Sequence, residues 1–437
     1  MLQPRRRTAL KASAALIGAP LVLASCGDGP AGGGDPDGDL VVWFPGTNPA
    51  EQAFINDVLV PAYTERTGRG AAVTFIDWGD MSTRLNAGFS SGTGPDVYGH
   101  GPAAVADLVG YDRALPLDEY IDQMDSAELE DLNVALESGI VDGTYYMFPI
   151  ASTGRHVGFN AAHAEAAGLD PDTPPASFVE LREWADELVV RSGDQIERAG
   201  IVFDARPESM QQAFTTLLWS NGGEMFSEDG SEVLFSGPEG VEALEWYVNL
   251  YQGSSPVDSN LGGTWDGLPP AQSPLVTEDT SMLFSDPSTF TQIMEAAPEL
   301  DLRIMDVLPF DDGEPAAFGG AATGVMINPD SSRIDAAWEF IQTIGDPELN
   351  NQYAEDVGHV PVHASAIESE YVQETPAVAA TVENADYFRS NPNIPAWTQV
   401  RDTLAQYIEQ ALSGQLTAQD ALDQAAAEVE QTLAEES

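Results

Sequence analysis

The chain reads, from Leu40 to Ile76, LVVWFPGTNPAEQAFINDVLVPAYTERTGRGAAVTFI. This stretch holds a short apolar run at 40–44, an amphipathic segment at 50–67 and a second apolar run at 72–76. Short apolar runs bounded by Gly and Pro are typical of buried strands, and an amphipathic segment of this length is typical of a helix. The βαβ pattern predicts an α/β fold.

The same alternation continues towards the C-terminus. Capping motifs that begin at Ser177, Ser236 and Thr417 precede helices predicted at 181–190, 241–251 and 421–433. No period of 20–50 residues recurs, which argues against solenoids and propellers. With 437 residues, 43% of them apolar, the chain can form two or three packed domains.

The charge of the chain excludes one class of partner. There are 71 acidic and 17 basic residues, a formal net charge of −54, and Lys11 is the only lysine. Repulsion of this size opposes binding to nucleic acid and to anionic membrane surfaces. It is best tolerated in concentrated salt, where the Debye length is about 3 Å at 1 M. We therefore expect a halophilic habitat, with an acidic surface that serves only solubility as the alternative.

The first 25 residues have the pattern of an export signal. Arg5, Arg6 and Arg7 precede a short apolar run that ends in the tetrapeptide LASC at 23–26. The run has about a dozen residues, whereas a membrane-spanning helix needs about 20. Arg6-Arg7-x-x-Leu10-Lys11 resembles a twin-arginine (Tat) signal, and LASC resembles the bacterial lipobox. We predict a signal peptide at 1–25.

Cys26 is the only cysteine, so no intramolecular disulfide can form. Its place in the lipobox predicts lipidation, with palmitate among the chains attached. Residues 26–38 are rich in Gly, Asp and Pro, which predicts a flexible tether. We expect an exported lipoprotein anchored to the outer face of the cytoplasmic membrane, at the cell surface or in the periplasm.

Eight collinear segments resemble the family 1 extracellular solute-binding proteins of ABC importers, the group that contains the maltose-binding protein. They are SGTGPDVY (91–98), LPLDEYI (115–121), YMFP (146–149) with the strand running to 160, WSNGG (219–223), GG (319–320) with VMIN (325–328), AAWEF (336–340), GHVPV (358–362) and NIPAW (393–397). The resemblance covers nearly all of residues 39–437.

The resemblance implies a periplasmic-binding-protein type II fold, with two α/β lobes, a multi-crossing hinge and a ligand cleft between the lobes. Lobe one would be 39–149 with 320–366, and lobe two 150–318 with 367–437. The crossings would lie near 148–153, 317–320 and 364–370. The implied function is a monomeric, non-enzymatic protein without a cofactor or metal, which captures a sugar, in particular an oligosaccharide, and delivers it to the ABC permease subunits.

Sugar sites need aromatic faces for stacking and planar polar groups that bracket hydroxyls. The aromatic candidates are Trp43 after the first strand, Trp265 in a Gly/Pro/Asp loop, and Trp397, whose segment resembles the family's stacking position. A core position is the alternative for Trp43 and Trp397. The polar candidates lie at strand ends, in the first loop or on the hinge in the family pattern: Thr47, Asn48, Tyr98, His100, Thr153, Arg155, Ser285 and Asp286. A structural ion pair is the alternative for Arg155. The backbone of Phe318, Gly319 and Gly320 could approach a ligand closely.

Other readings remain as alternatives. A glycerol 3-phosphate or other phosphorylated polyol ligand would need an arginine near Trp397. A surface carbohydrate hydrolase is the alternative from another class, although no catalytic residue can be chosen. The GFSSG segment at 88–92 matches a nucleophile elbow, but the residues before it look helical. His359 and His363 have zinc-helix spacing, but Pro361 interrupts any helix.

Overall fold

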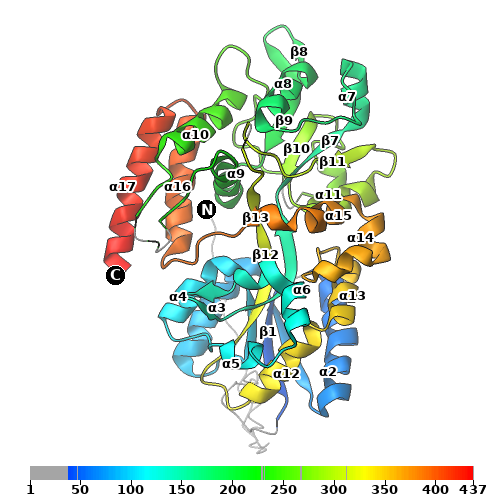
Figure 1. Ribbon diagram of the computed structural model, residues 1–437, viewed down its shortest axis with the longest axis vertical. Coiled ribbons are helices and arrows are strands. Elements are labelled where there is room, and N and C mark those ends of the chain that lie inside the picture. Colours follow the sequence, from blue (N-terminus) through cyan, green and yellow to red (C-terminus); the bar gives the residue numbers. More distant parts are fainter. Residues whose placement is uncertain are drawn as a thin grey trace, which may run out of the picture.

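The computed structural model describes residues 38–46, 48–227, 230, 232–265, 268–311 and 313–436. The predicted signal peptide, Cys26 and nearly all of the predicted tether lie outside the described residues, as does Thr47. Figure 1 shows two lobes, one above the other, each built around its own sheet. We call the lower one lobe one and the upper one lobe two.

Lobe one contains a six-stranded sheet in the order β13-β12-β3-β1-β2, with β6 also paired to β12. β1 runs parallel to β2 and β3, whereas β12 runs antiparallel to β3 and β6. The strands are β1 (Leu40–Pro45), β2 (Ala71–Ile76), β3 (Val97–His100), β6 (Phe148–Gly154), β12 (Ala317–Ile327) and β13 (Phe388–Arg389). The predicted strand-helix-strand unit is present, because one continuous helical segment made of α1 (Pro49–Phe54), a π-helical turn (Ile55–Leu59) and α2 (Val60–Thr67) joins β1 to β2.

Helices cover both faces of this sheet, which explains the apolar character of β1. Leu40, Val42 and Phe44 pack into one core cluster, while Trp43 packs against the other. The remaining elements of lobe one are α3 (Trp78–Ser91), the 3₁₀ turn η2 (Pro102–Ala104), α4 (Val105–Gly110), α5 (Asp118–Ile121), α6 (Ser126–Glu137), β4 (Ile140–Val141), β5 (Thr144–Tyr145), α12 (Ile334–Ile344) and α13 (Pro347–Val357).

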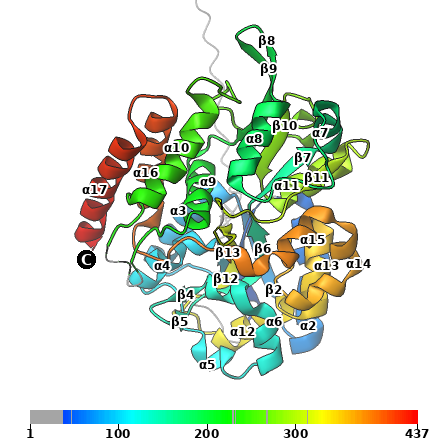
Figure 2. The same ribbon diagram turned by 45° about the horizontal axis from the view of Figure 1, so that its top comes forward.

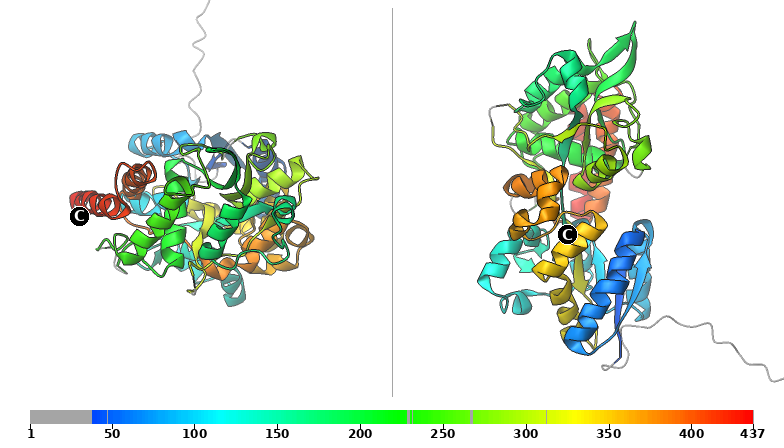
Figure 3. Two further views of the ribbon diagram at one scale, coloured as in Figure 1. Left: turned by 90° about the horizontal axis from the view of Figure 1, so that it is seen from above. Right: turned by 90° about the vertical axis from the view of Figure 1, so that its right-hand side faces the viewer.

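Lobe two contains a five-stranded sheet in the order β11-β7-β10-β9-β8. Its strands are β7 (His156–Asn160), β8 (Val190–Ser192), β9 (Gln195–Phe203), β10 (Thr280–Ser285) and β11 (Leu302–Ile304). Its helices are α7 (Ala161–Ala167), α8 (Phe178–Leu188), α9 (Pro207–Ser220), α10 (Pro238–Tyr251), the 3₁₀ turn Pro270–Gln272, α11 (Pro287–Ala296), α15 (Pro376–Glu383), α16 (Trp397–Leu412) and α17 (Ala418–Glu436). Figure 3 shows the red C-terminal helices along the outer flank of this lobe.

The chain passes between the lobes at strands that lie side by side. β6 of the first sheet leads directly into β7 of the second, and β12 returns beside β6. A further passage runs past Val360, which forms a bridge with Ser152, to the 3₁₀ turn Ala364–Glu368 and α14 (Glu370–Glu374). Another short 3₁₀ turn, Ala385–Tyr387, precedes β13. Figure 2 shows α13, α14 and α15 grouped at this junction. The predicted lobe boundaries stay a prediction.

A buried ion pair fixes the far end of β12 to the first sheet. Arg333 Nη2 lies 2.7 Å from Asp96 Oδ2, and both side chains are almost completely buried. The same carboxylate accepts hydrogen bonds from Val41 N at 2.7 Å and from Ser331 Oγ at 2.6 Å. Its partners come from β1 and from the segment after β12, and Asp96 itself directly precedes β3, so the carboxylate ties these three segments together.

Two further observations concern the alternatives drawn from the sequence. The GFSSG segment at 88–92 lies at the end of α3 and not on a strand-to-helix turn, so it does not form a nucleophile elbow. Within the described ranges, none of the helices combines the length and the apolar character that crossing a bilayer would require.

Candidate functional site

In both sheets the carboxyl ends of the parallel strands lie on the side of the junction between the lobes. In lobe one the parallel strands β1, β2 and β3 end at Pro45, Ile76 and His100. In lobe two the parallel strands β9 and β10 end at Phe203 and Ser285. Loops after such strand ends commonly hold ligands in open α/β sheets. The turn η2, directly after β3, contacts α16 of lobe two, so the two lobes meet at this edge.

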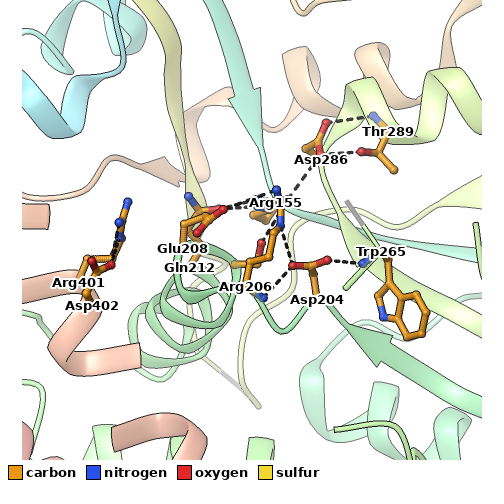
Figure 4. Close-up of polar contacts among 11 residues, drawn as sticks. Arg155, Asp204, Arg206, Glu208, Gln212, Trp265, Asp286, Thr289, Arg401 and Asp402 are labelled. Atoms are coloured by element: carbon orange, nitrogen blue, oxygen red, sulfur yellow. Dashed lines mark hydrogen bonds and ion pairs between the residues drawn. The ribbon is translucent and has the colours of Figure 1, made fainter. Parts of the chain in front are cut away.

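On the side of lobe two, Arg155 brings two elements together. Its Nε and Nη2 donate to Gln212 Oε1 of α9 at 2.8 and 2.5 Å, and its Nη1 lies 3.6 Å from Asp286 Oδ2. Asp286 caps α11, because its Oδ1 accepts from Thr289 N at 3.0 Å. Figure 4 shows Arg155 between Gln212 and Asp286. Two predicted site residues, Arg155 and Asp286, are therefore in contact.

A second charged group lies beside the first at the start of α9. Arg206 Nε donates to Asp204 Oδ1 at 2.9 Å, and its Nη1 lies 3.5 Å from Glu208 Oε1. The other oxygen of Asp204 accepts from the backbone N of Trp265 at 2.5 Å. The two arginines contact side chains one turn apart on α9, Gln212 and Glu208, and Figure 4 shows the indole of Trp265 pointing away from them.

The helix α16, which packs against α9, adds a third arginine. Arg401 Nη2 donates to Asp402 Oδ1 at 2.7 Å, and its side chain is about one quarter exposed. Arg401 is one helical turn after Trp397. The arginine that a phosphorylated ligand would need near Trp397 is therefore present. Its guanidinium is, however, bound to a carboxylate.

A cavity of about 1000 Å³ lies between the lobes. Lobe one contributes residues of α4 and of 137–143, and lobe two contributes residues of 219–230 and the end of α17. Residues 389–395 line it as well. Inside it, the guanidinium of Arg389 lies 4.9 Å from the ring centre of Trp219 and donates to Glu224 Oε2 at 2.5 Å. Gln211 on α9 donates to Asn391 of the cavity wall at 3.1 Å, and the next residue of the helix, Gln212, is the partner of Arg155.

On the side of lobe one, His100 has a defined tautomer. The backbone N–H of Gly101 donates to its Nδ1 at 2.9 Å, so that nitrogen carries no proton. Its Nε2 therefore carries the proton and donates to Ser82 Oγ at 3.1 Å. Burial lowers the pKa of His100 to about 4, which keeps the ring neutral. His100 also meets the indole of Trp78 edge to face, with ring centres 6.0 Å apart.

Two of the predicted aromatic residues are core residues, which corrects the sequence-based expectation. Trp397 is 0% exposed and packs with Val400 and Leu404 in the core of lobe two, so no ligand can reach its face. Tyr98 is also 0% exposed, and its hydroxyl donates to the carbonyl of Arg113 at 2.8 Å. Side chains alternate along a strand, so Tyr98 turns into the core while its neighbours face elsewhere.

Two predicted ligand-binding residues, Trp43 on the first strand and Asn48 in the loop after it, have structural roles instead. Trp43 is half-buried against α3, where a side chain at Gly88 would collide with its ring. Asn48 is exposed, but its Oδ1 accepts from Ala50 N at 3.0 Å and caps α1. Trp43 therefore serves packing, and Asn48 serves helix capping.

The hinge candidates have mixed positions. Thr153 lines a separate cavity of about 110 Å³ with Asp131, His363 and Thr381, and it pairs with Gly320. Gly320 has a φ of +99°, and a side chain there would collide with Ser390. The carbonyl of Phe318 accepts a hydrogen bond from Arg155 N at 2.9 Å. A side chain at Gly319 would collide with Phe388. Ser285 is 0% exposed. Gly320 also lines this smaller cavity, and neither glycine is among the residues that line the cavity between the lobes.

Trp265 lines another cavity inside lobe two, of about 190 Å³, together with Ser273 and Gln292. Its Nε1 and Ser273 Oγ are buried and have no hydrogen-bond partner among the described residues. The ring is therefore separated from the Arg155 group, although its backbone N touches Asp204.

Several residues of the site were missed by sequence reasoning. They are Trp78, Ser82, Asp204, Arg206, Glu208, Gln212, Trp219, Glu224, Arg389 and Arg401. Four of them, Trp78, Asp204, Arg206 and Glu208, follow a strand end or start a helix, which is a signal that the sequence does carry. Their pairing could not be predicted, because Arg389 and Glu224 are 165 residues apart.

The histidines considered for zinc lie in different surroundings. His363 Nδ1 is 3.0 Å from Asp131 Oδ2, whereas His359 Nε2 is 3.8 Å from Glu51 Oε1. No group of three or more His, Cys, Asp or Glu side chains suited to a metal was found within the described part of the chain.

The chain belongs to a family of bacterial extracellular solute-binding proteins, whose model matches residues 59–380. The predicted family resemblance and the class of binding protein, not enzyme, are therefore confirmed at this level. A binding protein of Brucella abortus (strain 2308) is 24% identical over 361 residues, which cover 82% of this chain and 84% of that protein.

Solved structures confirm the predicted fold. The cyclic α-maltosyl-1,6-maltose binding protein from Arthrobacter globiformis has a TM-score of 0.76 and 25% identity, over 93% of this chain and 99% of that one. The sugar-binding protein MalE from Xanthomonas citri has a TM-score of 0.77 and 17% identity, over 91% and 98% of the two chains. The architecture is the periplasmic-binding-protein fold.

Proposed function

We propose that this protein is the ligand-capturing component of an ABC importer and that its ligand is a neutral sugar, in particular an oligosaccharide. The family and the fold support the first half. The Arthrobacter protein is named for the oligosaccharide that it binds and the Xanthomonas protein is named a sugar-binding protein, which supports the second half. A cavity of about 1000 Å³ is large enough for several sugar rings.

The observation that carries the proposal is the pairing of arginines with carboxylates around the site. Arg155 contacts Asp286, Arg206 contacts Asp204 and Glu208, Arg389 contacts Glu224, and Arg401 contacts Asp402. Such pairs present planar donors and acceptors together, which suits the bracketing of hydroxyl groups. They leave little net positive charge for an anion, whose approach the acidic protein as a whole also opposes.

The phosphorylated polyol remains the second candidate ligand, and Arg401 is the observation in its favour. A phosphate could replace Asp402 as the partner of this guanidinium, which is partly exposed. This would require the ligand to displace a hydrogen-bonded carboxylate in a region where acidic groups outnumber basic ones.

A thermal-shift screen separates the two ligands. A ligand at 100 times its Kd adds about 2.7 kcal/mol to the free energy of unfolding, which gives a clear rise in Tm. We expect a rise with one or more neutral oligosaccharides, such as maltotriose, mannotriose and cyclic α-maltosyl-1,6-maltose, and none with glycerol 3-phosphate. A rise with glycerol 3-phosphate alone would overturn the neutral-ligand proposal. Sugar recovered uncut after incubation would also separate binding from the hydrolase alternative.

We further propose export by the twin-arginine route and lipid anchoring through Cys26, on the sequence motifs alone. Replacing Cys26 by Ser removes the thiol that is lipidated, so the variant should leave the membrane fraction for the medium while its sugar affinity stays unchanged. Retention of Cys26→Ser in washed membranes would contradict the anchor. Arg6→Lys/Arg7→Lys tests the export route separately.

The acidic composition supports a proposal of salt adaptation. Removal of residues 1–25 takes away four basic residues and no acidic one, which leaves 13 basic against 71 acidic residues. Folding concentrates this charge, so screening should stabilise the native state. We expect Tm to rise steeply with NaCl between about 0.01 and 1 M. A flat Tm over this range would contradict the proposal.

A further inference from the structure

The ring of Trp78 differs from the other tryptophans of the chain in its exposure. It is 47% exposed, whereas Trp219, Trp246, Trp338 and Trp397 are all less than 10% exposed. Trp78 is the first residue of α3 and comes directly after β2, at the edge where β1 and β3 also end. The turn η2, which follows β3, contacts α16 of lobe two. Trp78 therefore lies on the side of lobe one that faces lobe two.

Two residues at the ends of neighbouring strands lie next to the indole of Trp78. His100 meets it edge to face at 6.0 Å, with an interplanar angle of 86°. Gly46, at the end of β1, has a φ of +102°, and a Cβ placed there would lie 3.5 Å from Trp78 Nε1. A glycine at this position lets the loop pass close to the indole edge, and the exposed area remains available to a ligand. Flat, exposed aromatic surface of this kind is what the C–H face of a sugar ring packs on.

Ser82 adds a polar group one turn along the same helix. Because His100 Nε2 donates to Ser82 Oγ, the serine oxygen is already an acceptor there. Its own hydroxyl hydrogen is then free to be donated outwards, and Ser82 is exposed. The hydrogen bonds from the Gly101 amide to His100 and from His100 to Ser82 therefore leave one hydroxyl donor for a ligand, on an exposed residue one turn from Trp78.

We propose that Trp78 and Ser82 form a sugar subsite on the wall of lobe one, in which Trp78 stacks on one pyranose ring and Ser82 donates to an oxygen of that ring or its substituents. His100 is a positioning residue, since it contacts both side chains. The inference rests on the proposed function, because it assigns one ring of a neutral sugar to a particular wall.

The test compares sugar affinity in the full-length protein and three variants by calorimetry, with the panel maltotriose, mannotriose and cyclic α-maltosyl-1,6-maltose. Trp78→Ala should bind about 10- to 100-fold more weakly, because a stacked ring loses its contacts. Ser82→Ala should lose about fivefold, the effect of one hydrogen bond. Tyr387→Ala is the matched control, since Tyr387 is also an exposed aromatic residue, 41% exposed, at a different place in the fold. It should bind as the wild type does.

A second readout responds only to contact with the ring. Sugar should protect part of the tryptophan fluorescence of the wild type from acrylamide quenching, and this protection should disappear in Trp78→Phe. If the wild type binds a sugar of the panel but Trp78→Ala binds it equally well, or protection persists in Trp78→Phe, the subsite is refuted while the proposed function stands. If the wild type binds no sugar of the panel, the proposed function and the subsite fail together.

Discussion

Trp78 and Trp397 occupy the same position in their helices, yet they face different surroundings. Each is the first residue of a long helix, α3 and α16, and each is followed at the third and seventh positions by buried apolar residues. Trp397 continues the apolar stripe of α16 into the core of lobe two and is 0% exposed. Trp78 extends the stripe of α3 past the edge of the sheet and is 47% exposed. Periodicity therefore predicts which face of a helix is apolar, but not where that face leaves the core.

The charged groups show the same contrast between interior and junction. Asp96 and Arg333 form an ion pair that is nearly inaccessible and holds three segments together. Arg206 is 36% exposed beside Asp204 and Glu208, at the start of α9. A buried pair cannot exchange its partner for a ligand, whereas a half-exposed one can add hydroxyl groups as further partners. The regions around Trp397 and Asp96 thus support the fold, and those around Trp78 and Arg206 suit binding.

The largest expected effect is that of Trp397→Ala on stability. Removing a buried indole from the core should lower the free energy of unfolding by about 3–5 kcal/mol. Urea unfolding followed by circular dichroism measures this, and Trp397→Phe should lose less. The folded fraction should retain the sugar affinity of the wild type. Normal stability with lost sugar affinity would show that Trp397 belongs to the ligand site, and would contradict the contrast drawn between Trp397 and Trp78.

Arg333→Met tests the buried ion pair and is expected to cost about 3–5 kcal/mol, because Asp96 would be left as a buried charge without its ionic partner. The matched control is Arg303→Met. Arg303 pairs with Asp301 and Asp172 on the surface, with its own side chain 35% exposed. Surface pairs of this kind contribute little to stability, so Arg303→Met should leave the free energy of unfolding almost unchanged. Equal losses in the two variants would show that burial does not distinguish these arginines.

Trp78→Ala is expected to change the free energy of unfolding by no more than about 0.5 kcal/mol, the usual range for surface substitutions. The same urea experiment measures it, which places it directly beside Trp397→Ala. A loss of several kcal/mol would mean that Trp78 is part of the core, and the contrast between the two tryptophans would no longer hold.

The pH dependence of binding is the smallest expected effect. Burial lowers the pKa of His100 to about 4, below the usual value of about 6.5. Between these values the unfolded chain binds more protons, so the contribution of His100 to stability is present above about pH 6.5 and decreases as the pH falls towards 4. Sugar affinity should stay constant from pH 8 to about 6 and weaken only as Nδ1 is protonated near pH 4. Calorimetric titration across this range measures it; a midpoint near pH 6.5 would contradict the lowered pKa of His100.

The fold was predictable because its signals are local or collinear. The apolar runs of β1 and β2, the caps of α8 and α17, and the eight family-like segments each depend on neighbouring residues only. The site was predictable in part. Arg155, Asp286 and His100 lie at strand ends or on the hinge, and they do make polar contacts near the junction between the lobes.

The rest depends on how distant segments meet. Nothing near Trp397 reveals that lobe two closes over its ring, and nothing near Arg155 reveals that Gln212 and Asp286 approach it from α9 and α11. Exposure at the end of a helix, and the partner of a charge, are properties of tertiary packing. This is why Trp78 and Arg206 were missed while Trp397 and Tyr98 were chosen.

The central claim, that the junction between the lobes binds a neutral sugar, is tested most directly by titrating the purified protein with the three neutral oligosaccharides and with glycerol 3-phosphate, each at about 0.1 and 1 M NaCl. Screening of charges weakens electrostatic interactions over this range of salt. We predict saturable binding of a neutral oligosaccharide with an affinity that changes little with salt, and no binding of glycerol 3-phosphate. Binding of glycerol 3-phosphate that strengthens as salt rises, with no response to the neutral sugars, would contradict the account.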